Sequence, residues 1–381
     1  MIMKKSFLFT MITLLFVQQG TLPVELGIES SLPRYDWAIV GAGIAGITAL
    51  AILLDSGVEP STIAWIDPEF NVGRVGKSYR NVPGNIAVER IILFVQNCPY
   101  FKDINSASLE QLYTYNPAEF PPLSVVADPL QDFTAYLRNK VVPVQNTITS
   151  LTYVDDHWAL KGADCAINAH KVILAIGAKP KRLNYAIEEI PLDDALDKNK
   201  LATCVSADDR VAVFGGMHSA ILILKYLSEM SVKQIINFYI DPYFYDAPGL
   251  EGETALWAQT VLEQAPPANL IRVLSIPENT KTMLSTCNKA IYAIGYETNP
   301  ILVNETLPVT FDESTGMIDH NLYGIGIAFP PTGIVNGQKV AKNGLHAYLG
   351  YAKKLIPHWI SNERFYPHND IKPAHYELPW I

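Results

Sequence analysis

Residues 35–46 read YDWAIVGAGIAG, an apolar run that turns through three glycines into a second apolar run, ITALAILLDSG. The pattern predicts a buried strand, a tight turn and a helix. Gly41 permits the turn, Gly43 lets the backbone approach a pyrophosphate, and Gly46 lets the helix pack against the strand. The helix N-terminus would face the negative charge of the ligand. The stretch therefore predicts a dinucleotide-binding site.

An acidic residue follows at the spacing that such a site requires. The next apolar run, STIAWIDPE, ends at Asp67, about 20 residues after the last glycine, where a carboxylate binds the ribose of a dinucleotide. The cofactor-binding residues expected in this first site are Gly41, Ala42, Gly43, Ala45, Gly46 and Asp67.

A second strand, turn and helix begins at Arg210 with RVAVFGGMHSAILILKYLSEM. Gly215 keeps the first glycine position, but Met217 replaces the middle glycine, and its side chain would obstruct a pyrophosphate. Gly216 and the hydroxyl of Ser219 remain candidates for contacts with phosphate. Two interpretations stay open: a working nicotinamide site, or a retained fold whose pocket no longer binds.

The strand that follows the second turn, QIINFYIDP, ends at Asp241. Neither Arg nor Lys stands near it to receive a 2′-phosphate. The sequence therefore favours NADH over NADPH for this second site.

Two similar strands, HKVILAIGAKP and NKAIYAIGYETNP, lie one before and one after the second glycine-rich unit. This arrangement predicts an α/β fold with two Rossmann-like dinucleotide-binding domains, the second inserted into the first. We expect further cofactor contacts at Gly177, Gly295 and, in the final strand NLYGIGIAFPP, Gly326. The expected parts are a leader (1–32), a first domain (33–185), an insertion (186–288), a return (289–356) and a tail (357–381).

The loop after Asp67, EFNVGRVGKSYRNVPGN, is rich in Gly and Asn and would run past the ligand. Tyr79, Arg80, Asn81 and Asn85 are candidates for polar contacts with a flavin, although Asn81 and Asn85 are also ordinary turn residues. Further on, 129–140 has the spacing of a helix, and an antiparallel piece follows that returns to a buried strand at 172–176. The part played by residues 86–125 is open.

The composition limits the kinds of partner and of metal or redox site that we expect. The 381 residues are 49% hydrophobic with a net charge of −9, which argues against a nucleic-acid partner. The partner we expect is a small-molecule substrate. Cys98, Cys165, Cys204 and Cys287 are far apart, so neither a redox dithiol nor a metal site is expected. His358, His368 and His375 in or near the tail also lack ligand spacing. Oligomeric state cannot be read from the chain.

The N-terminus has the pattern of a signal peptide. Two lysines in residues 1–5 precede the apolar run SFLFTMITLLFV, which is too short to span a bilayer as a helix. We expect export or membrane association through this leader only. The alternatives are a cytoplasmic protein with a hydrophobic extension packed on it, or a start codon placed too early.

The order of these motifs resembles the flavoproteins with two dinucleotide-binding domains, which implies FAD in the first domain and NAD(P)H in the inserted one. Low-molecular-weight thioredoxin reductases carry Cys-x-x-Cys in the insertion, and this chain does not. The ferredoxin reductases that resemble them lack the dithiol, and KSYRNVPG is similar to their loop. These enzymes have Gly-Asp in the final strand, where this chain has Gly326-Ile327.

The flavin monooxygenases, including N-hydroxylating enzymes, are the most similar group. Their second motif, Gly-Gly-Gly-x-Ser-Ala, matches 215–220 apart from Met217, and their Tyr-x-x-Val-x-x-Asn matches Tyr79, Val82 and Asn85. YAIGYETNP is similar to the ATGY stretch of the N-hydroxylating enzymes, with Ile294 in place of Thr. The resemblance implies that Asn85 lies over the flavin as a catalytic residue. The linking signature F-x-G-x-x-x-H and a tryptophan after the loop's first glycine are absent.

The sequence thus predicts an FAD-dependent oxidoreductase, driven by NAD(P)H and similar to the monooxygenases. A ferredoxin-reductase-like flavoprotein is one alternative. Another is a flavin-binding protein whose nicotinamide site has degenerated.

Overall fold

The computed structural model describes residues 32–240, 250–307, 309–335 and 338–361. The chain divides after Pro33, and all the elements below lie in the part that begins at Arg34. Residues 1–31 of the leader, Asp241, His368 and His375 lie outside the described residues. Among the described helices, none combines the length and the apolar character needed to cross a bilayer.

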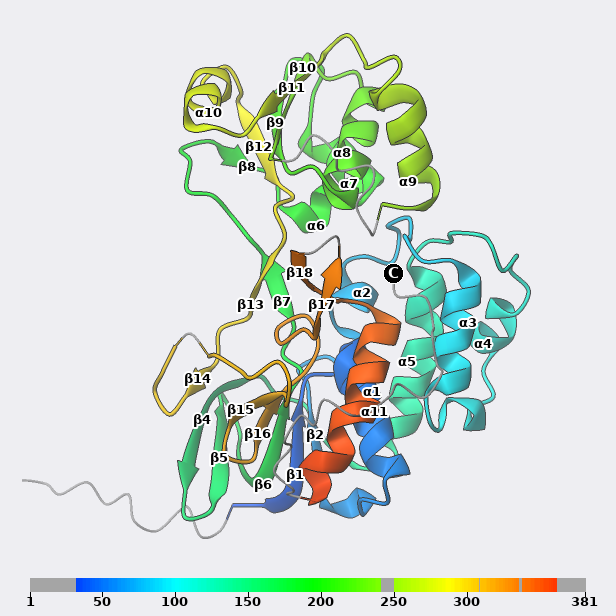
Figure 1. The fold of residues 1–381 in the computed structure, drawn as a ribbon, viewed down its shortest axis with the longest axis vertical. Helices are drawn as coiled ribbons and strands as arrows, with labels where there is room; N and C mark the ends of the chain where they lie inside the picture. The colour runs from blue at the N-terminus through cyan, green and yellow to red at the C-terminus, as the bar shows by residue number, and fades with distance from the viewer. Residues whose placement is uncertain (1–31, 241–249, 308, 336–337, 362–381) are drawn as a thin grey trace, which may run out of the picture. The chain divides into compact units, whose positions relative to one another are not determined.

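A nine-stranded sheet contains the first glycine-rich stretch (Figure 1). Its main strand order is β14-β4-β5-β6-β1-β2-β3, with β16 also paired to β6 and β15 to β16. The strands are β1 (Arg34–Val40), β2 (Ile63–Ile66), β3 (Val142–Val144), β4 (Ile148–Val154), β5 (His157–Gly162), β6 (Ala166–Leu174), β14 (Leu302–Val303), β15 (Met317–Asp319) and β16 (Leu322–Gly324).

Successive side chains of β1 point to opposite faces of this sheet, so the sheet has one hydrophobic core on each face. Trp37 and Ile39 point to the face covered by helices, whereas Ala38 and Val40 belong to the core on the other face. The helices of this part are α1 (Ile44–Asp55), α2 (Gly73–Lys77), α3 (Val88–Asn97), α4 (Ala107–Leu112), α5 (Ser124–Arg138) and α11 (Leu345–Ser361). Because β1 is parallel to β2, β6 pairs β1 on its other side, and α1 begins directly after β1, the glycine turn lies at the carboxyl edge of the sheet.

Some local expectations are confirmed and others are corrected. The antiparallel piece is present as β4, β5 and β6, and β6 is buried from Val172 to Leu174. The helix expected from Pro129 begins earlier, at Ser124, and Pro129 lies inside it as a buried residue. A proline here removes one helical hydrogen bond, but its ring fills the core, so the helix continues. Likewise α11 runs to Ser361, past the tail boundary expected at 357.

The end of α11 is held by a lysine. The Nζ of Lys171, on β6, donates to the carbonyls of Trp359 at 2.7 Å and Ile360 at 2.9 Å. Burial lowers the pKa of Lys171, yet a cation at a helix C-terminus is well placed to satisfy its last carbonyls. This contact fixes the last turn of α11, beyond Pro357, to β6.

A second, five-stranded sheet contains the other glycine-rich stretch, and all its strands are parallel in the order β11-β10-β9-β12-β8. The strands are β8 (Glu188–Glu189), β9 (Arg210–Phe214), β10 (Gln234–Tyr239), β11 (Leu270–Leu274) and β12 (Lys289–Tyr292). The helices are α6 (Leu192–Ala195), α7 (Lys198–Cys204), α8 (His218–Glu229), α9 (Gly252–Trp257) and α10 (Pro277–Leu284).

Two short strands connect the two sheets. β7 (Ala178–Pro180) leaves the first sheet, β13 (Tyr296–Thr298) returns to it, and the two pair antiparallel (Figure 1). A separate hairpin, β17 (Thr332–Val335) and β18 (Gln338–Ala341), precedes α11. Strands of the first sheet therefore occur both before and after the whole second sheet, and the predicted α/β fold with an inserted second unit is confirmed.

Candidate cofactor sites

The first glycine turn depends on Gly41. Its φ of +113° lies in the region that favours glycine, and its N–H donates to the carbonyl of Ile66 at 2.7 Å. A Cβ at Gly41 would lie 2.3 Å from the carbonyl oxygen of Ala175. The position therefore requires glycine, because the turn packs against the ends of both β2 and β6.

The other two glycines have different surroundings. A Cβ on Gly46 would lie 2.0 Å from the Gly41 carbonyl oxygen, so this glycine allows α1 to pack on the turn. A Cβ on Gly43 would meet only the Cα of Gly73, at 3.9 Å. The fold thus leaves space beside Gly43, at the N-cap of α1, where the fingerprint places a pyrophosphate.

Asp67 lies against the turn, as the spacing predicts. One carboxylate oxygen accepts from the N–H of Ala42 at 2.7 Å, and the other accepts from Glu69 at 2.9 Å and Phe70 at 2.6 Å. An ionised carboxylate has about four acceptor positions, so Asp67 can hold the turn and still accept from a ribose hydroxyl. The acceptor positions that remain on Asp67 and the space beside Gly43 together fit a dinucleotide.

Three later glycines also adopt positive φ. A Cβ on Gly326 (φ +89°) would lie 2.6 Å from the Cβ of Ala45, which places the end of the final strand against the start of α1. A Cβ on Gly177 would meet only the Nδ2 of Asn299, at 3.7 Å, and one on Gly295 would meet nothing within 4 Å. The structure therefore brings Gly326 and Ala45 together, while Gly177 and Gly295 border open space.

The second turn repeats the geometry of the first. Gly215 has a φ of +129°, its N–H donates to the carbonyl of Phe238 at 2.8 Å, and its Cβ would lie 2.2 Å from the carbonyl oxygen of Ala293. Ala220, fully buried, occupies the place that Gly46 has in the first turn. The backbone of a dinucleotide turn is thus retained in the insertion.

Each turn is also supported by a side-chain hydrogen bond that the glycine motif does not predict. Trp65 Nε1 donates to the carbonyl of Gly41 at 3.1 Å, and Asn237 Nδ2 donates to the carbonyl of Gly215 at 2.8 Å. The two side chains occupy the same register, opposite Ile39 and Val213 respectively. What the two residues share is a side-chain hydrogen-bond donor, opposite the residue that stands two positions before the first glycine of the turn.

Met217 is where the two turns differ. It is the N-cap of α8 with an extended backbone (φ −103°, ψ −172°), as Gly43 is for α1 (φ −75°, ψ 178°). Its side chain is 43% exposed, at the position that the first turn keeps open. Gly216 and Ser219 flank it, each partly buried.

The loop expected beside a flavin contacts the second unit in the structure. The hydroxyl of Tyr79 donates to Asp193 Oδ1 at 2.7 Å and lies 3.0 Å from the hydroxyl of Tyr296, while Arg74 pairs with the same Asp193 carboxylate. Burial and the neighbouring Tyr296 raise the pKa of Tyr79, so its hydroxyl stays protonated. Tyr79 and Val82 pack with the core of the inserted unit.

Asn81 follows the same pattern. Its Nδ2 donates to Asp197 Oδ2 at 3.1 Å, and Asp197 caps α7. Arg80 pairs with Asp128, and Asn85 is exposed in the turn before α3. The structure therefore places Tyr79 and Asn81 in the contact with the inserted unit, and their predicted contacts with a flavin stay a prediction.

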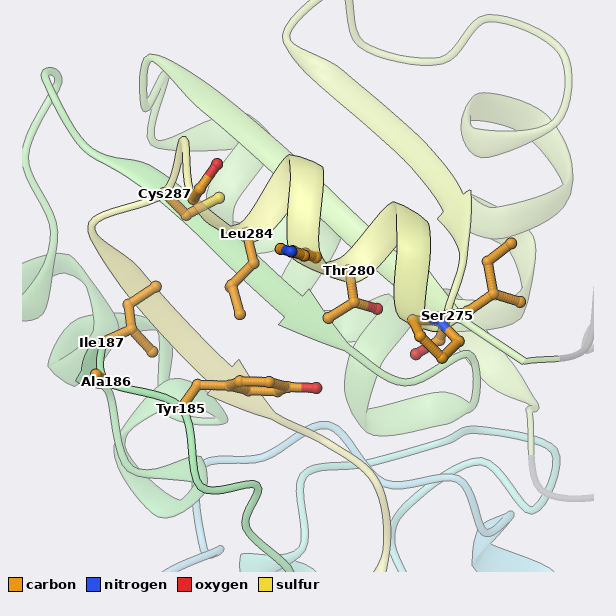
Figure 2. A pocket seen from close by; sticks show the side chains of 11 residues that line it. Tyr185, Ala186, Ile187, Ser275, Thr280, Leu284 and Cys287 are labelled. Atoms are coloured by element: carbon orange, nitrogen blue, oxygen red, sulfur yellow. The ribbon is translucent and has the colours of Figure 1, made fainter.

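A hollow of about 660 Å³ lies in the inserted unit beside α10 (Figure 2). Tyr185, Thr280, Leu284 and Cys287 are among the side chains that line it, and Ser275 lies at one end. No residue of either glycine turn lines this hollow. Among the described residues, three or more His, Cys, Asp or Glu side chains do not gather as a metal would require.

The Asp193 contact predicts a stability effect. Asp193→Ala removes the acceptor shared by Tyr79 and Arg74, and we expect the free energy of unfolding to fall by about 1–3 kcal/mol. Urea denaturation would measure it. The control is Asp194→Ala, whose carboxylate pairs only loosely with Lys200 at 3.7 Å. Equal losses for the two variants would contradict a special role for Asp193.

Comparison with known proteins agrees with this geometry. Residues 38–179 match a family model described as FAD-NAD(P)-binding. The protein named Monooxygenase AgnR1, from Paecilomyces divaricatus, is 25% identical over 384 residues, covering 85% of this chain and 97% of the relative.

Solved structures share the fold. A flavin monooxygenase from Stenotrophomonas maltophilia aligns with a TM-score of 0.55 at 14% identity, covering 87% of this chain and 99% of its own. The bacillithiol disulfide reductase Bdr from Staphylococcus aureus aligns with a TM-score of 0.56 at 12% identity, covering 87% and 100%. The chain is thus similar to an FAD-NAD(P)-binding family over residues 38–179 and to a protein named a monooxygenase over most of its length, and it has the two-domain fold of these flavoproteins.

Proposed function

We propose that this protein is an FAD-dependent oxidoreductase of the monooxygenase type that takes electrons from NAD(P)H. The observation that carries the proposal is the pair of glycine turns with the same geometry, each at the carboxyl end of a strand whose two neighbours are parallel to it. A relative that is named a monooxygenase and aligns over nearly its whole length supports the reaction class.

The residues of the first turn would hold FAD. The N-terminus of α1, open beside Gly43, would bind the pyrophosphate, and Asp67 would accept from the ribose while it orders the turn. Gly326 brings the final strand to the same helix end. When bound, FAD would supply the redox chemistry, and the protein would supply orientation and exclusion of water.

In the second turn, Gly215, Gly216 and Ser219 would hold the nicotinamide dinucleotide, and we propose NADH in preference to NADPH. The segment after β10 offers neither Arg nor Lys in the sequence. Arg272 reaches this strand end from β11, but its Nε donates to Asn237 Oδ1 at 3.1 Å and its guanidinium stacks 4.5 Å from the Tyr239 ring. Faster flavin reduction by NADPH would contradict this preference.

Three finer proposals come from the sequence. Asn85, in the turn before α3, would act beside the flavin on a small-molecule substrate. The leader would direct export or membrane association. The alternative of a flavin-binding protein without a working nicotinamide site draws its support from Met217.

The first site is tested by Gly43→Val. The extended backbone and the open surroundings of Gly43 allow the fold to accept valine, but its methyl groups would meet the pyrophosphate. We expect protein purified with added FAD to lose its flavin, measured as the ratio of flavin to protein absorbance, with an unchanged circular dichroism spectrum. Gly350→Val, on the exposed side of α11, is the control and should keep flavin. Full flavin content in both variants would refute the site.

The second site is tested by Met217→Gly. Removing the side chain should open the turn and lower the dissociation constant for NADH about tenfold, or about 1.4 kcal/mol. Anaerobic stopped-flow absorbance of the oxidised flavin, with NADH and NADPH in turn, would measure it. Met217→Leu keeps the bulk and should show no gain. If neither the native protein nor Met217→Gly is reduced by either dinucleotide, the flavin-binding alternative holds.

A further inference from the structure

α10 carries a polar residue on the side that faces the second sheet. Leu284 packs against the core of this sheet, and Thr280 lies one turn earlier on the same side of the helix. Thr280 is only 6% exposed, yet its hydroxyl has no hydrogen-bond partner among the residues that the structure describes. Thr134 and Thr260, also in helices, each donate to the carbonyl one turn earlier at 2.8 Å. Thr280 is therefore a buried polar group that the helix itself does not satisfy.

Thr280 lines the hollow of about 660 Å³ beside α10 (Figure 2). Pockets for small molecules measure about 300–1,000 Å³ and combine mostly apolar walls with a few polar groups. Ile187 and Leu284 supply apolar walls, and Ser275 supplies a second hydroxyl that no described residue binds. The hollow thus has the size and the mixed lining of a ligand site.

Tyr185 adds an aromatic surface to the hollow. Its ring stacks on Phe214 with centroids 5.8 Å apart, and Phe214 stacks on Phe238 with centroids 4.6 Å apart. Tyr185 is 41% exposed, and Figure 2 shows its ring facing Leu284 across the hollow. A planar aromatic ligand could continue the stack on the part of the Tyr185 ring that Phe214 leaves uncovered.

The charge beside these hydroxyls favours an anion. Lys281 lines the hollow, and no carboxylate of the described residues lies within ion-pair distance of it. The hollow also borders the N-terminus of α10, whose N-cap, Ile276, has no side chain able to accept from the first backbone N–H groups. The acidic residue of the first turn, Glu278, is exposed and does not line the hollow.

We propose that this hollow is a binding site for an aromatic carboxylate, separate from both dinucleotide sites. The ring of the ligand would lie on Tyr185, between it and Leu284. The carboxylate would accept hydrogen bonds from the hydroxyls of Thr280 and Ser275 and from the ammonium of Lys281. The site goes beyond the proposed function, because no residue of either glycine turn lines it.

The ligand class is tested by isothermal titration calorimetry of the full-length protein, purified with added FAD. The probes are naphthoate, naphthylmethanol, which has the ring without the charge, and cyclohexanecarboxylate, which has the charge without the aromatic ring. We expect naphthoate to bind one per chain, with a dissociation constant about tenfold lower than that of either other probe.

Two variants locate the contact. Thr280→Val keeps the shape and removes the hydroxyl, and Lys281→Met keeps the stem and removes the charge. We expect each to raise the dissociation constant for naphthoate about tenfold. The melting temperature of Thr280→Val should not fall, because valine leaves no buried hydroxyl without a partner. Lys233→Met, at an exposed lysine of the same unit outside the hollow, is the control and should bind like the native protein.

Three outcomes would overturn the site. The first is a native protein that does not bind naphthoate, or that binds naphthylmethanol equally well. The second is naphthoate binding that both Thr280→Val and Lys281→Met leave unchanged, since the anion would then lie elsewhere. The third is displacement of naphthoate by NADH in a competition titration, which would show that the hollow is part of the dinucleotide site.

Discussion

The close approach of a glycine to the carbonyl of a neighbouring strand is the constraint on which both halves of this molecule depend. At Gly41 and Gly215 a side chain is forbidden twice, by a φ above +110° and by a carbonyl oxygen within 2.3 Å of the Cβ position. Each glycine N–H also completes the hydrogen bonding of the next strand. The start of each long helix, and so the direction of its dipole, follows from this contact.

The second constraint is the connection between the units. Because the inserted sheet is entered through β7 and left through β13, the two strands pair where they cross between the sheets. At the start of β13, Tyr296 contacts Tyr79 from the loop of the first unit, and Asp193 binds both Tyr79 and Arg74. A loop that sequence patterns associate with the flavin is therefore also part of the contact between the two units.

The sequence predicts well those features of the fold that depend on a few neighbouring residues. The strands, both turns and their order follow from apolar runs and glycine spacing, since burial and backbone conformation act over a few residues. Pro129 misled the prediction of α5 because a buried proline can be accommodated within a helix whose face is apolar. The hydrogen-bond partners of Tyr79 could not be predicted from the sequence, because only the tertiary fold brings Asp193 and Tyr296 to it.

The supports beneath the turns were missed for a related reason. Trp65 and Asn237 differ in size and polarity, so no residue pattern links them, although each donates one hydrogen bond to the carbonyl of its glycine. The space beside Gly43, by contrast, was predictable from the fingerprint alone.

The matched supports have an evolutionary consequence. Each turn is held by its own strands and by its own side-chain hydrogen-bond donor, so the geometry of one turn does not depend on the ligand of the other. Substitutions at the mouth of the second turn, such as methionine for glycine, can accumulate without loss of foldability. A change of ligand contacts in the insertion can thus leave the geometry of the first turn unaltered.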